Sequence, residues 1–178
     1  MAATFEFNED NGAATGSPAA GTSRATAVTQ VNWKNIDDAT TAYSSYPVTA
    51  GNNSFTKYQS GKFSGTWNQV SAGLFAHTAG TLGTGLTLKG TVTSTYATPA
   101  TSANAALTTD MTAVIAIGSG LGVSFNSTPQ AASPTTSFNS TTANPAFTQF
   151  LATQLQTTGS AAAGDTATVT LTLQYNEN

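Results

Sequence analysis

The sequence predicts an all-β protein, an antiparallel β-sandwich of jelly-roll-like type with extended loops or an N-terminal arm. Three observations predict it. About eight to ten short segments have the composition or the alternation of strands, and turn residues recur about every ten positions. No segment has a convincing helical pattern, and no repeat of fixed period suggests a solenoid or a propeller. The 178 residues suit one domain of ordinary size.

The N-terminal region is expected to contain a strand followed by a loose segment. In TFEFN, Phe5 and Phe7 share one face. Residues 8–26, NEDNGAATGSPAAGTSRAT, are rich in small residues without periodicity, so we expect a loop or an extended arm. We therefore assign residues 1–26 to an N-terminal strand and flexible arm, and residues 27–178 to a single β-sandwich domain.

The middle of the chain alternates between expected strands and loops. The expected strands are AVTQVNW (27–33), SFTKYQ with KFSGTWNQV (54–70), GLTLKGTVTSTYATP (85–99), MTAVIAIG (111–118) and LGVSF (121–125). Turn and loop residues dominate KNIDD (34–38), AYSSYPVTAGNN (42–53) and the Ser-, Thr- and Pro-rich residues 127–145.

Two expected strands close the chain. AFTQFLATQLQTT (146–158) fits both a helical and a strand pattern, and we favour the strand. The final stretch, GDTATVTLTLQYNEN, alternates Thr or Gln with Ala167, Val169, Leu171, Leu173 and Tyr175. We expect these two strands to pair as a hairpin through a turn at residues 162–165. The apolar residues of the last strand then face the core, and its threonines face something polar and uncharged.

Composition narrows the function. Only 7% of residues are charged and the net charge is −3, against about a quarter charged in an ordinary soluble protein. Nucleic-acid binding needs clustered cations, so we expect none. The chain has no cysteine and so neither disulfides nor thiolate metal sites. We expect no signal peptide and no membrane span, because no segment has the required apolar length. So few charges suggest that partners or further copies cover much of the surface.

Candidate catalytic groups are few. His77 is the sole histidine, and no GxSxG motif accompanies it, so we expect a packed or edge residue. The spacing of the carboxylates suggests no pair across a cleft and no calcium loop. They are Glu6, Glu9, Asp10, Asp37, Asp38, Asp110, Asp165 and Glu177. We therefore expect no catalytic residue, no cofactor-binding residue, no metal ligand and no cofactor.

The aromatic residues allow a second kind of site. Trp33, Trp67, Tyr43, Tyr46 and Tyr58 would suit a platform that stacks on carbohydrate. Core packing is the simpler assignment for the two tryptophans, and the tyrosines of AYSSYP are the better candidates for contact. Ice binding by threonine ranks needs a regular repeat, and the chain has none.

Two blocks of residues carry a resemblance to a known group. The first is AGNNSFTKYQSGKFSGTWNQVSA (50–72), and the second is FLATQLQTTGSAAAGDTATVTLTLQYNEN (150–178). The positions that matter are Ser54, Phe55, Tyr58, Phe63, Gly65, Gln69 and Ser71, then Gln154, Gly164, Asp165, Tyr175 and Glu177. With these features the chain resembles uncharacterised virion structural proteins of tailed bacteriophages. The resemblance implies a β-sandwich component of the head, neck or tail, without enzymatic activity and without particular site residues.

We therefore expect a non-enzymatic virion structural protein, either a capsid decoration or cement subunit or an accessory tail subunit. Its partners would be itself, as a homo-oligomer, and other virion structural proteins, with no nucleic acid and no membrane. It would be made in the host cytoplasm and located in the virion. The alternatives are a secreted, extracellular filament or pilus-like subunit that polymerises by strand donation, with residues 1–8 as the donated strand, and a carbohydrate-binding module.

Overall fold

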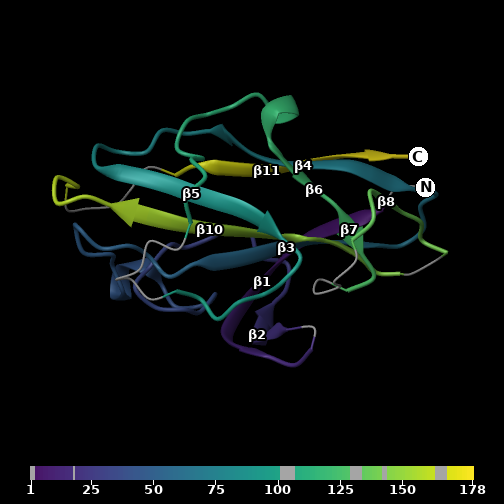
Figure 1. Cartoon of the computed structure of the whole chain (residues 1–178), viewed down its shortest axis with the longest axis horizontal. Coiled ribbons are helices and arrows are strands. Elements are labelled where there is room, and N and C mark those ends of the chain that lie inside the picture. Colours follow the sequence, from purple (N-terminus) through teal and green to yellow (C-terminus); the bar gives the residue numbers. More distant parts are fainter. Residues whose placement is uncertain (1–2, 18, 101–106, 129–133, 142–143, 163–167) are drawn as a thin grey trace.

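In the computed structural model, two antiparallel β-sheets pack face to face (Figure 1). The structure describes residues 3–17, 19–100, 107–128, 134–141, 144–162 and 168–178. The all-β sandwich expected from the sequence is confirmed. Two short 3-10 helices, η1 (Tyr43–Ser45) and η2 (Ile117–Ser119), are the helical elements of these residues.

The larger layer, sheet A, has the strand order β2-β1-β3-β10-β5, and β9 joins β3 to β7. Its strands are β1 (Thr4–Thr15), β2 (Ala20–Ala25), β3 (Lys57–Ser64), β5 (Leu86–Thr93), β7 (Phe125–Asn126), β9 (Ala146–Thr148) and β10 (Phe150–Thr157). The register sets Phe5 opposite Phe63 and Glu9 opposite Gln59 across β1 and β3. Opposed residues share a face, so Phe5, Phe63, Glu9 and Gln59 lie on one face of sheet A. On this face Phe5 and Phe63 pack on Tyr175 of the second sheet.

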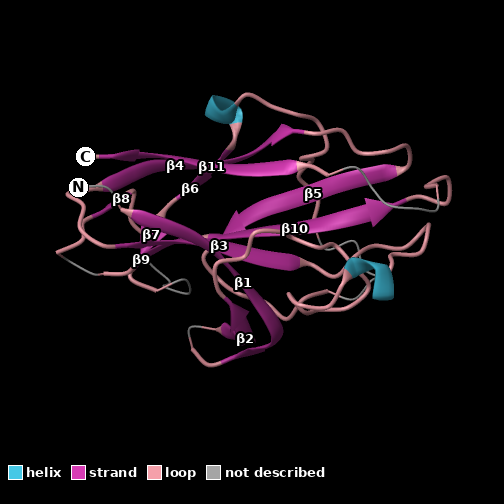
Figure 2. Cartoon of the chain, turned by 180° about the vertical axis from the view of Figure 1, so that it is seen from behind, coloured by secondary structure: helices cyan, strands magenta, loops and turns pink. Residues whose placement is uncertain are grey.

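The smaller layer, sheet B, has the order β11-β4-β6, with β8 also paired to β4. Its strands are β4 (Val70–Ala79), β6 (Leu121–Val123), β8 (Ser137–Phe138) and β11 (Thr170–Glu177). From behind, β4 and β11 run along the top of the molecule over the strands of sheet A (Figure 2). From β3 to β8 each successive strand changes sheet, and β11 returns to sheet B after β9 and β10. This alternation is in keeping with the jelly-roll-like expectation.

The core lies between the two layers and is aromatic at one end and aliphatic at the other. At one end Phe63, Trp67, Val70 and Phe125 are buried, and the Phe63 and Tyr175 rings meet edge to face with centroids 4.7 Å apart. At the other end the buried residues are Phe75, Leu88, Met111, Val123 and Leu151. Burial of such side chains is worth about 1.5–3 kcal/mol each and is the main stabilising term.

The outer face of sheet A carries a separate apolar cluster. Tyr58 and Phe150 alternate with the inward-facing residues of β3 and β10, so they point away from sheet B. They pack with Ala152 and with Tyr96, from the segment that follows β5. The Tyr96 hydroxyl donates to the Gly12 carbonyl at 2.7 Å. Burial raises the pKa of both tyrosines, so both hydroxyls stay neutral.

The prediction of a loop or extended arm at residues 8–26 is wrong. β1 runs to Thr15 and pairs with β3 on one side and with β2 on the other. The pattern misleads because residues Asn8–Asn11 are polar yet buried. Their charges find partners that are distant in the sequence. Residues Thr4–Thr15 and Ala20–Ala25 therefore belong to sheet A and do not form an arm outside the sandwich.

Three other expectations for single elements differ from the structure. Residues 27–33 form no strand, because the chain leaves the edge of β1 at Ala27, whose φ is +51°. Residues 111–118 form a connecting segment that ends in η2. The last two strands do not form a hairpin: β10 lies in sheet A, and β11 pairs with β4 in sheet B. The turn expected at residues 162–165 falls mostly outside the described residues.

The other expected strands are confirmed. Residues 54–70 provide β3 and the start of β4, residues 85–99 provide β5, and LGVSF provides β6 and the first residue of β7. The strand preferred for residues 146–158 is present as β9 and β10. Within the part of the chain that the structure describes, no helix has the length and apolarity to cross a membrane.

Candidate interaction surface

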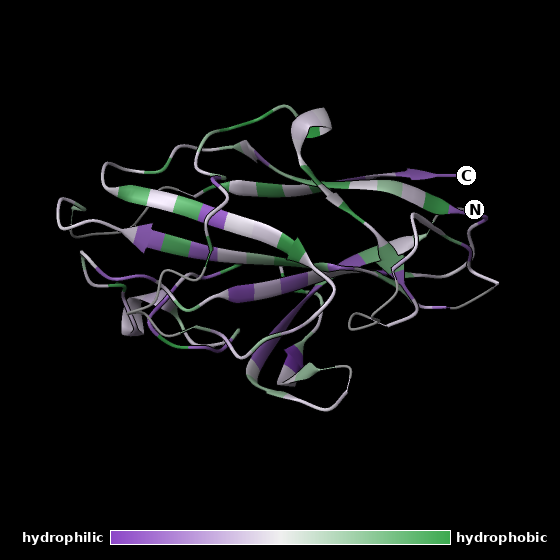
Figure 3. Cartoon of the chain, viewed as in Figure 1, coloured by the Kyte–Doolittle hydropathy of each residue, from purple (hydrophilic) through white to green (hydrophobic). Residues whose placement is uncertain are grey.

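The charges of the protein are concentrated in sheet A and its loops. Each of the five basic residues is paired with a carboxylate, and every pair lies on this side of the sandwich. The pairs are Arg24–Asp10, Lys34–Asp38, Lys57–Glu9, Lys62–Glu6 and Lys89–Asp110. Hydropathy colouring shows strongly hydrophilic residues in β1, β2 and β3 of this layer (Figure 3). No cationic patch that would suit nucleic acid is formed by these five residues.

A fully buried ion pair lies at the centre of this charged region. The Lys57 ammonium donates to Glu9 Oε1 at 3.2 Å and to the Asp38 carbonyl at 2.8 Å. Asn11 donates to the same Glu9 oxygen, and Gln59 donates to the other at 3.1 Å. Because the pair is almost inaccessible to water, these bonds compensate its desolvation. The arrangement is structural, with every donor directed at a protein acceptor.

The segment after residue 33 covers this pair and is held by its own polar contacts. Asp38 Oδ1 accepts hydrogen bonds from the Thr40 and Thr41 amides at 2.8 and 2.6 Å, and Lys34 donates to it at 3.0 Å. Burial opposes ionisation of Asp38, but these hydrogen bonds outweigh it and hold the pKa of the carboxyl well below its usual range. The turn expected at residues 34–38 is therefore a capped turn that closes one end of the sandwich.

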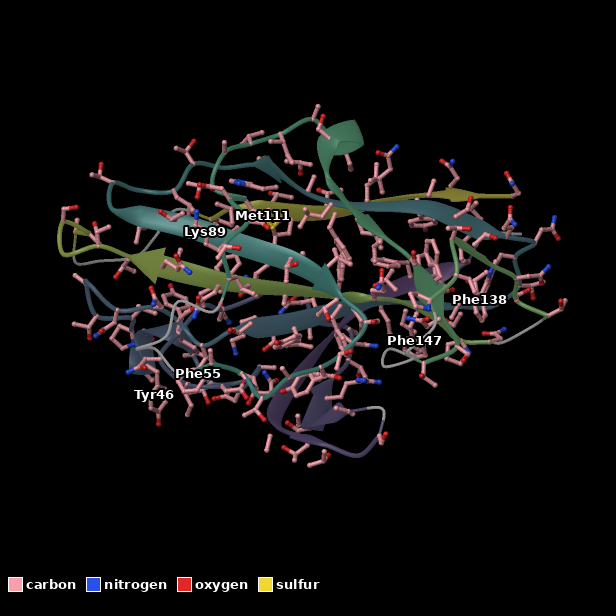
Figure 4. The ribbon with its side chains drawn as sticks, viewed as in Figure 1. Tyr46, Phe55, Lys89, Met111, Phe138 and Phe147 are labelled. Carbon is pink, nitrogen blue, oxygen red and sulfur yellow. The ribbon has the colours of Figure 1, made fainter. Side chains whose placement is uncertain are left out.

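His77 is a packed histidine, as expected. Its side chain is fully buried, Nδ1 lies 2.9 Å from the Met111 carbonyl, and Nε2 lies 2.9 Å from the Ala79 carbonyl. A neutral imidazole donates to only one of these oxygens. Met111 itself lies between the two layers (Figure 4). Both ring nitrogens are thus occupied by the backbone, and neither faces a cavity.

The carboxylates do not gather around a common site. Within the described residues, no group of three or more His, Cys, Asp or Glu side chains is placed to hold a metal ion. Asp37 is used by the Asn11 side chain and the Gly12 amide, and Glu177 accepts from the Ala3 amide at 2.7 Å. Asp165 lies outside the described residues. Glu9 also accepts from the Asn11 side chain and is buried.

The aromatic residues divide as the composition suggested. Trp67 is buried in the core, and Trp33 is half-buried with its indole N–H donating to Thr153 Oγ1 at 3.1 Å. Tyr43 and Tyr46 are exposed, by 47% and 42%. Tyr46 lies at the periphery of the molecule (Figure 4). The two tryptophans and Tyr58 are therefore not exposed enough to stack on a carbohydrate. Of the residues considered for such a platform, Tyr43 and Tyr46 on one loop remain.

Sheet B presents a surface of a different kind. Along β11 the side chains of Leu171, Leu173 and Tyr175 pack inward, so the alternate residues point outward. Thr170, Gln174 and Asn176 are exposed, and the Thr172 hydroxyl lies 2.6 Å from that of Thr78 on β4. Glu177 and His77 are the ionisable groups in the four strands that make up this sheet, apart from Tyr175. We call the outward-facing polar residues of β11 and β4 the polar face: Thr170, Thr172, Gln174, Asn176 and Thr78. Leu74, opposite Gln174, lies beside them.

Two uncharged features border the polar face. The segment Ala113–Gly118 runs beside β4, where the Ile115 amide donates to the His77 carbonyl at 3.0 Å, and Val114 is 51% exposed. A shallow hollow of about 460 Å³ opens where the partner of β4 changes from β8 to β6. Its lining includes Gln69, Ala72 and Ser137 and no charged residue. Exposed apolar segments of this kind commonly serve as contact surfaces.

The sequence identified part of this surface. The alternation of the last strand predicted both its inward and its outward residues, of which Ala167 lies outside the described residues. The exposure of Ala113–Gly118 was not predicted, because an apolar run of strand length was interpreted as a core strand. The separation of charge between the sheets is also not visible in the sequence, since it depends on which strands pair.

Comparison with known proteins adds no relative, because no family model, no curated protein and no solved structure matches the chain significantly. The class of protein is therefore defined by the fold alone, an antiparallel β-sandwich with one charged layer and one nearly uncharged layer.

Proposed function

We propose that the protein is a non-enzymatic structural subunit of a virion, a capsid decoration or cement protein or an accessory tail protein, that acts through contacts with its own copies and with other virion proteins. The observation that carries the proposal is the polar face. An outward surface of Thr, Gln and Asn hydrogen-bonds to a neighbouring protein without the cost of desolvating charges. The virion as location rests on the resemblance described above.

The remaining geometry supports an assembly role over a catalytic one. The sole histidine is committed to backbone carbonyls, and the described carboxylates are engaged with amides or ammonium groups. The hollow beside β4 has neither a titratable group nor an aromatic ring in its lining. Binding and catalytic pockets usually combine apolar walls with such convergent groups.

Strand donation by residues 1–8 is a weaker alternative. β1 contains most of this segment, whose residues Thr4–Asn8 all pair with β3, and the Phe7 carbonyl also accepts from the Val28 amide. Its donation would break the pairing with β3 and expose Phe5 and Phe7, which pack on Phe63 and Phe75. A carbohydrate-binding module is weaker still, because only Tyr43 and Tyr46 are exposed among the proposed platform residues.

Electron microscopy of the purified protein and of particles that contain it tests the proposal. We expect density for the sandwich on a capsid or a tail, with sheet B against a neighbouring protein. A helical fibre would favour the filament alternative. A protein that stays monomeric and binds no particle would contradict both, and binding on a glycan array would favour the carbohydrate module.

A further inference from the structure

The edges of the two sheets are not equally protected. The outer edge of β5 is covered by the segment at residues 109–111, where Gly90 donates to the Thr109 carbonyl at 3.0 Å and Met111 to the Leu88 carbonyl at 2.8 Å. One edge of β4 is covered by β8, β6 and Ile115. β2 is a short edge strand that carries Arg24, and short length and charge both discourage pairing.

β11 has a longer uncharged open edge. Residues Thr4–Asn8 of β1 also lack a second partner strand, but this stretch carries Glu6, and its Phe7 carbonyl accepts from the Val28 amide. The eight residues of β11 pair with β4 on one side, and no other described segment gives this strand a backbone hydrogen bond. From Thr170 to Asn176 it has no charge, no proline and no glycine. Both register shifts between β11 and β4 place the extra residue on β4, so β11 keeps a regular pleat. It lacks the devices by which natural proteins guard an edge.

We propose that β11 pairs antiparallel with β11 of a second copy of this chain, so that the two B sheets form one continuous sheet across a twofold axis. The inference rests on the proposed function and identifies a second copy of this chain as a partner of the protein. Uncharged backbone edges pair readily when no side chain opposes the approach. The low net charge of −3 per chain adds little repulsion between copies.

The alternation of the strand restricts the register. Directly opposed residues lie on the same face, so inward residues must oppose inward residues. Centring the axis on Leu173 overlaps the uncharged part of the strand fully. Thr172 of one copy then lies opposite Gln174 of the other, and Leu171 lies opposite Tyr175. The two Glu177 side chains lie at opposite ends of the paired strands, so like charges do not meet.

Sedimentation equilibrium of the full chain over a range of concentrations tests the pairing. We expect a dimer, and we expect Gln174→Lys to raise its dissociation constant about tenfold or more, because the charge enters twice per dimer. Gln174 is exposed, so the variant keeps its fold. Ser23→Lys is the control: it adds the same charge at an exposed position of β2 and should leave the dissociation constant unchanged.

Cysteine cross-linking tests the register, because the chain has no cysteine of its own. A mixture of Thr172→Cys and Gln174→Cys chains should form a mixed disulfide on oxidation, since opposed Cβ atoms lie about 4.5–5.5 Å apart. A mixture of Thr78→Cys and Gln174→Cys should not, because β4 is one strand farther from the axis. A chain that is monomeric throughout, or a dimer that Gln174→Lys leaves intact, overturns the pairing. If such a chain still binds particles, the proposed function stands without it.

Discussion

Removing one member of the buried ion pair between Glu9 and Lys57 should destabilise the protein strongly. The side chains of the pair are 1% and 0% exposed, with 3.2 Å between Nζ and Oε1. Removing one member of a buried pair typically costs about 3–5 kcal/mol, because the other charge stays buried. In Glu9→Gln, Lys57 keeps its bond to the Asp38 carbonyl. We therefore expect the lower end of that range, a loss of about 3 kcal/mol in the free energy of unfolding.

The chain contains a matched control for this change. Lys62 and Glu6 form a pair on the same two strands, at 2.8 Å, but both side chains are close to one-third exposed. Exposed pairs contribute at most about 1 kcal/mol, so Glu6→Gln should change the free energy of unfolding very little. The assay is urea unfolding followed by tryptophan fluorescence, with midpoints compared at constant slope. If Glu9→Gln and Glu6→Gln cost the same, the argument from burial is wrong.

A double variant separates the charge from the packing. Glu9→Leu combined with Lys57→Met removes both charges and keeps similar volumes. Replacement of a buried pair by apolar residues is often neutral or stabilising, so this variant should recover most of the stability that Glu9→Gln loses. A double variant as unstable as the single one would mean that the hydrogen bonds from Asn11 and Gln59 carry the effect instead.

Three further changes test other parts of the structure. Gly80→Ala should lower the free energy of unfolding by more than about 2 kcal/mol, because φ at Gly80 is +92° and the new Cβ would lie 2.3 Å from the backbone oxygen of Thr168. Gly122→Ala is the control and should be nearly neutral, because nothing lies within 4 Å of its new Cβ. Equal urea midpoints for the two variants would refute the clash at Gly80. Asp110 has its pKa lowered to about 2 by hydrogen bonds from Thr112. Because this folded-state pKa is below the usual 3.8, the ionised Asp110 carboxylate stabilises the fold above pH about 4, and this contribution is lost as the pH falls toward 2. The urea midpoint of Asp110→Asn should therefore fall less over that range than the midpoint of the wild type. Ala72→Gly should raise stability by about 0.5 kcal/mol, because φ is +52° at this alanine and relief of left-handed strain exceeds the added freedom of the unfolded chain; a lower melting temperature would contradict this.

The strands that were predicted correctly are those in which local alternation matches burial. β5 and β11 alternate cleanly, and each has its apolar residues against the core. β1 was missed beyond Asn8 because its inward residues include Glu9 and Asn11, which no local rule places inside a protein. Their burial depends on Lys57 and Asp37, which are distant in the sequence. A polar segment can therefore be buried when other buried residues, distant in the sequence, bind its polar groups.

Which strands pair with each other was the second feature that the sequence did not predict. β10 and β11 are consecutive and of opposite direction, so a hairpin was the simplest expectation. Their inward faces, however, pack on each other across the core, where Leu151 and Leu171 belong to one cluster. Alternation defines the face that a strand buries but not the neighbour to which it bonds. For the same reason the sequence predicted the threonine face but not that β4 would be the neighbour of this strand.

Hydrogen–deuterium exchange of the protein in its assembled and dilute states tests most directly whether sheet B is the contact surface. We expect assembly to slow exchange of the backbone amides of β11, with little change in β2, the edge strand of the charged layer. Slower exchange confined to β2 and its neighbours, with β11 unchanged, would contradict this expectation.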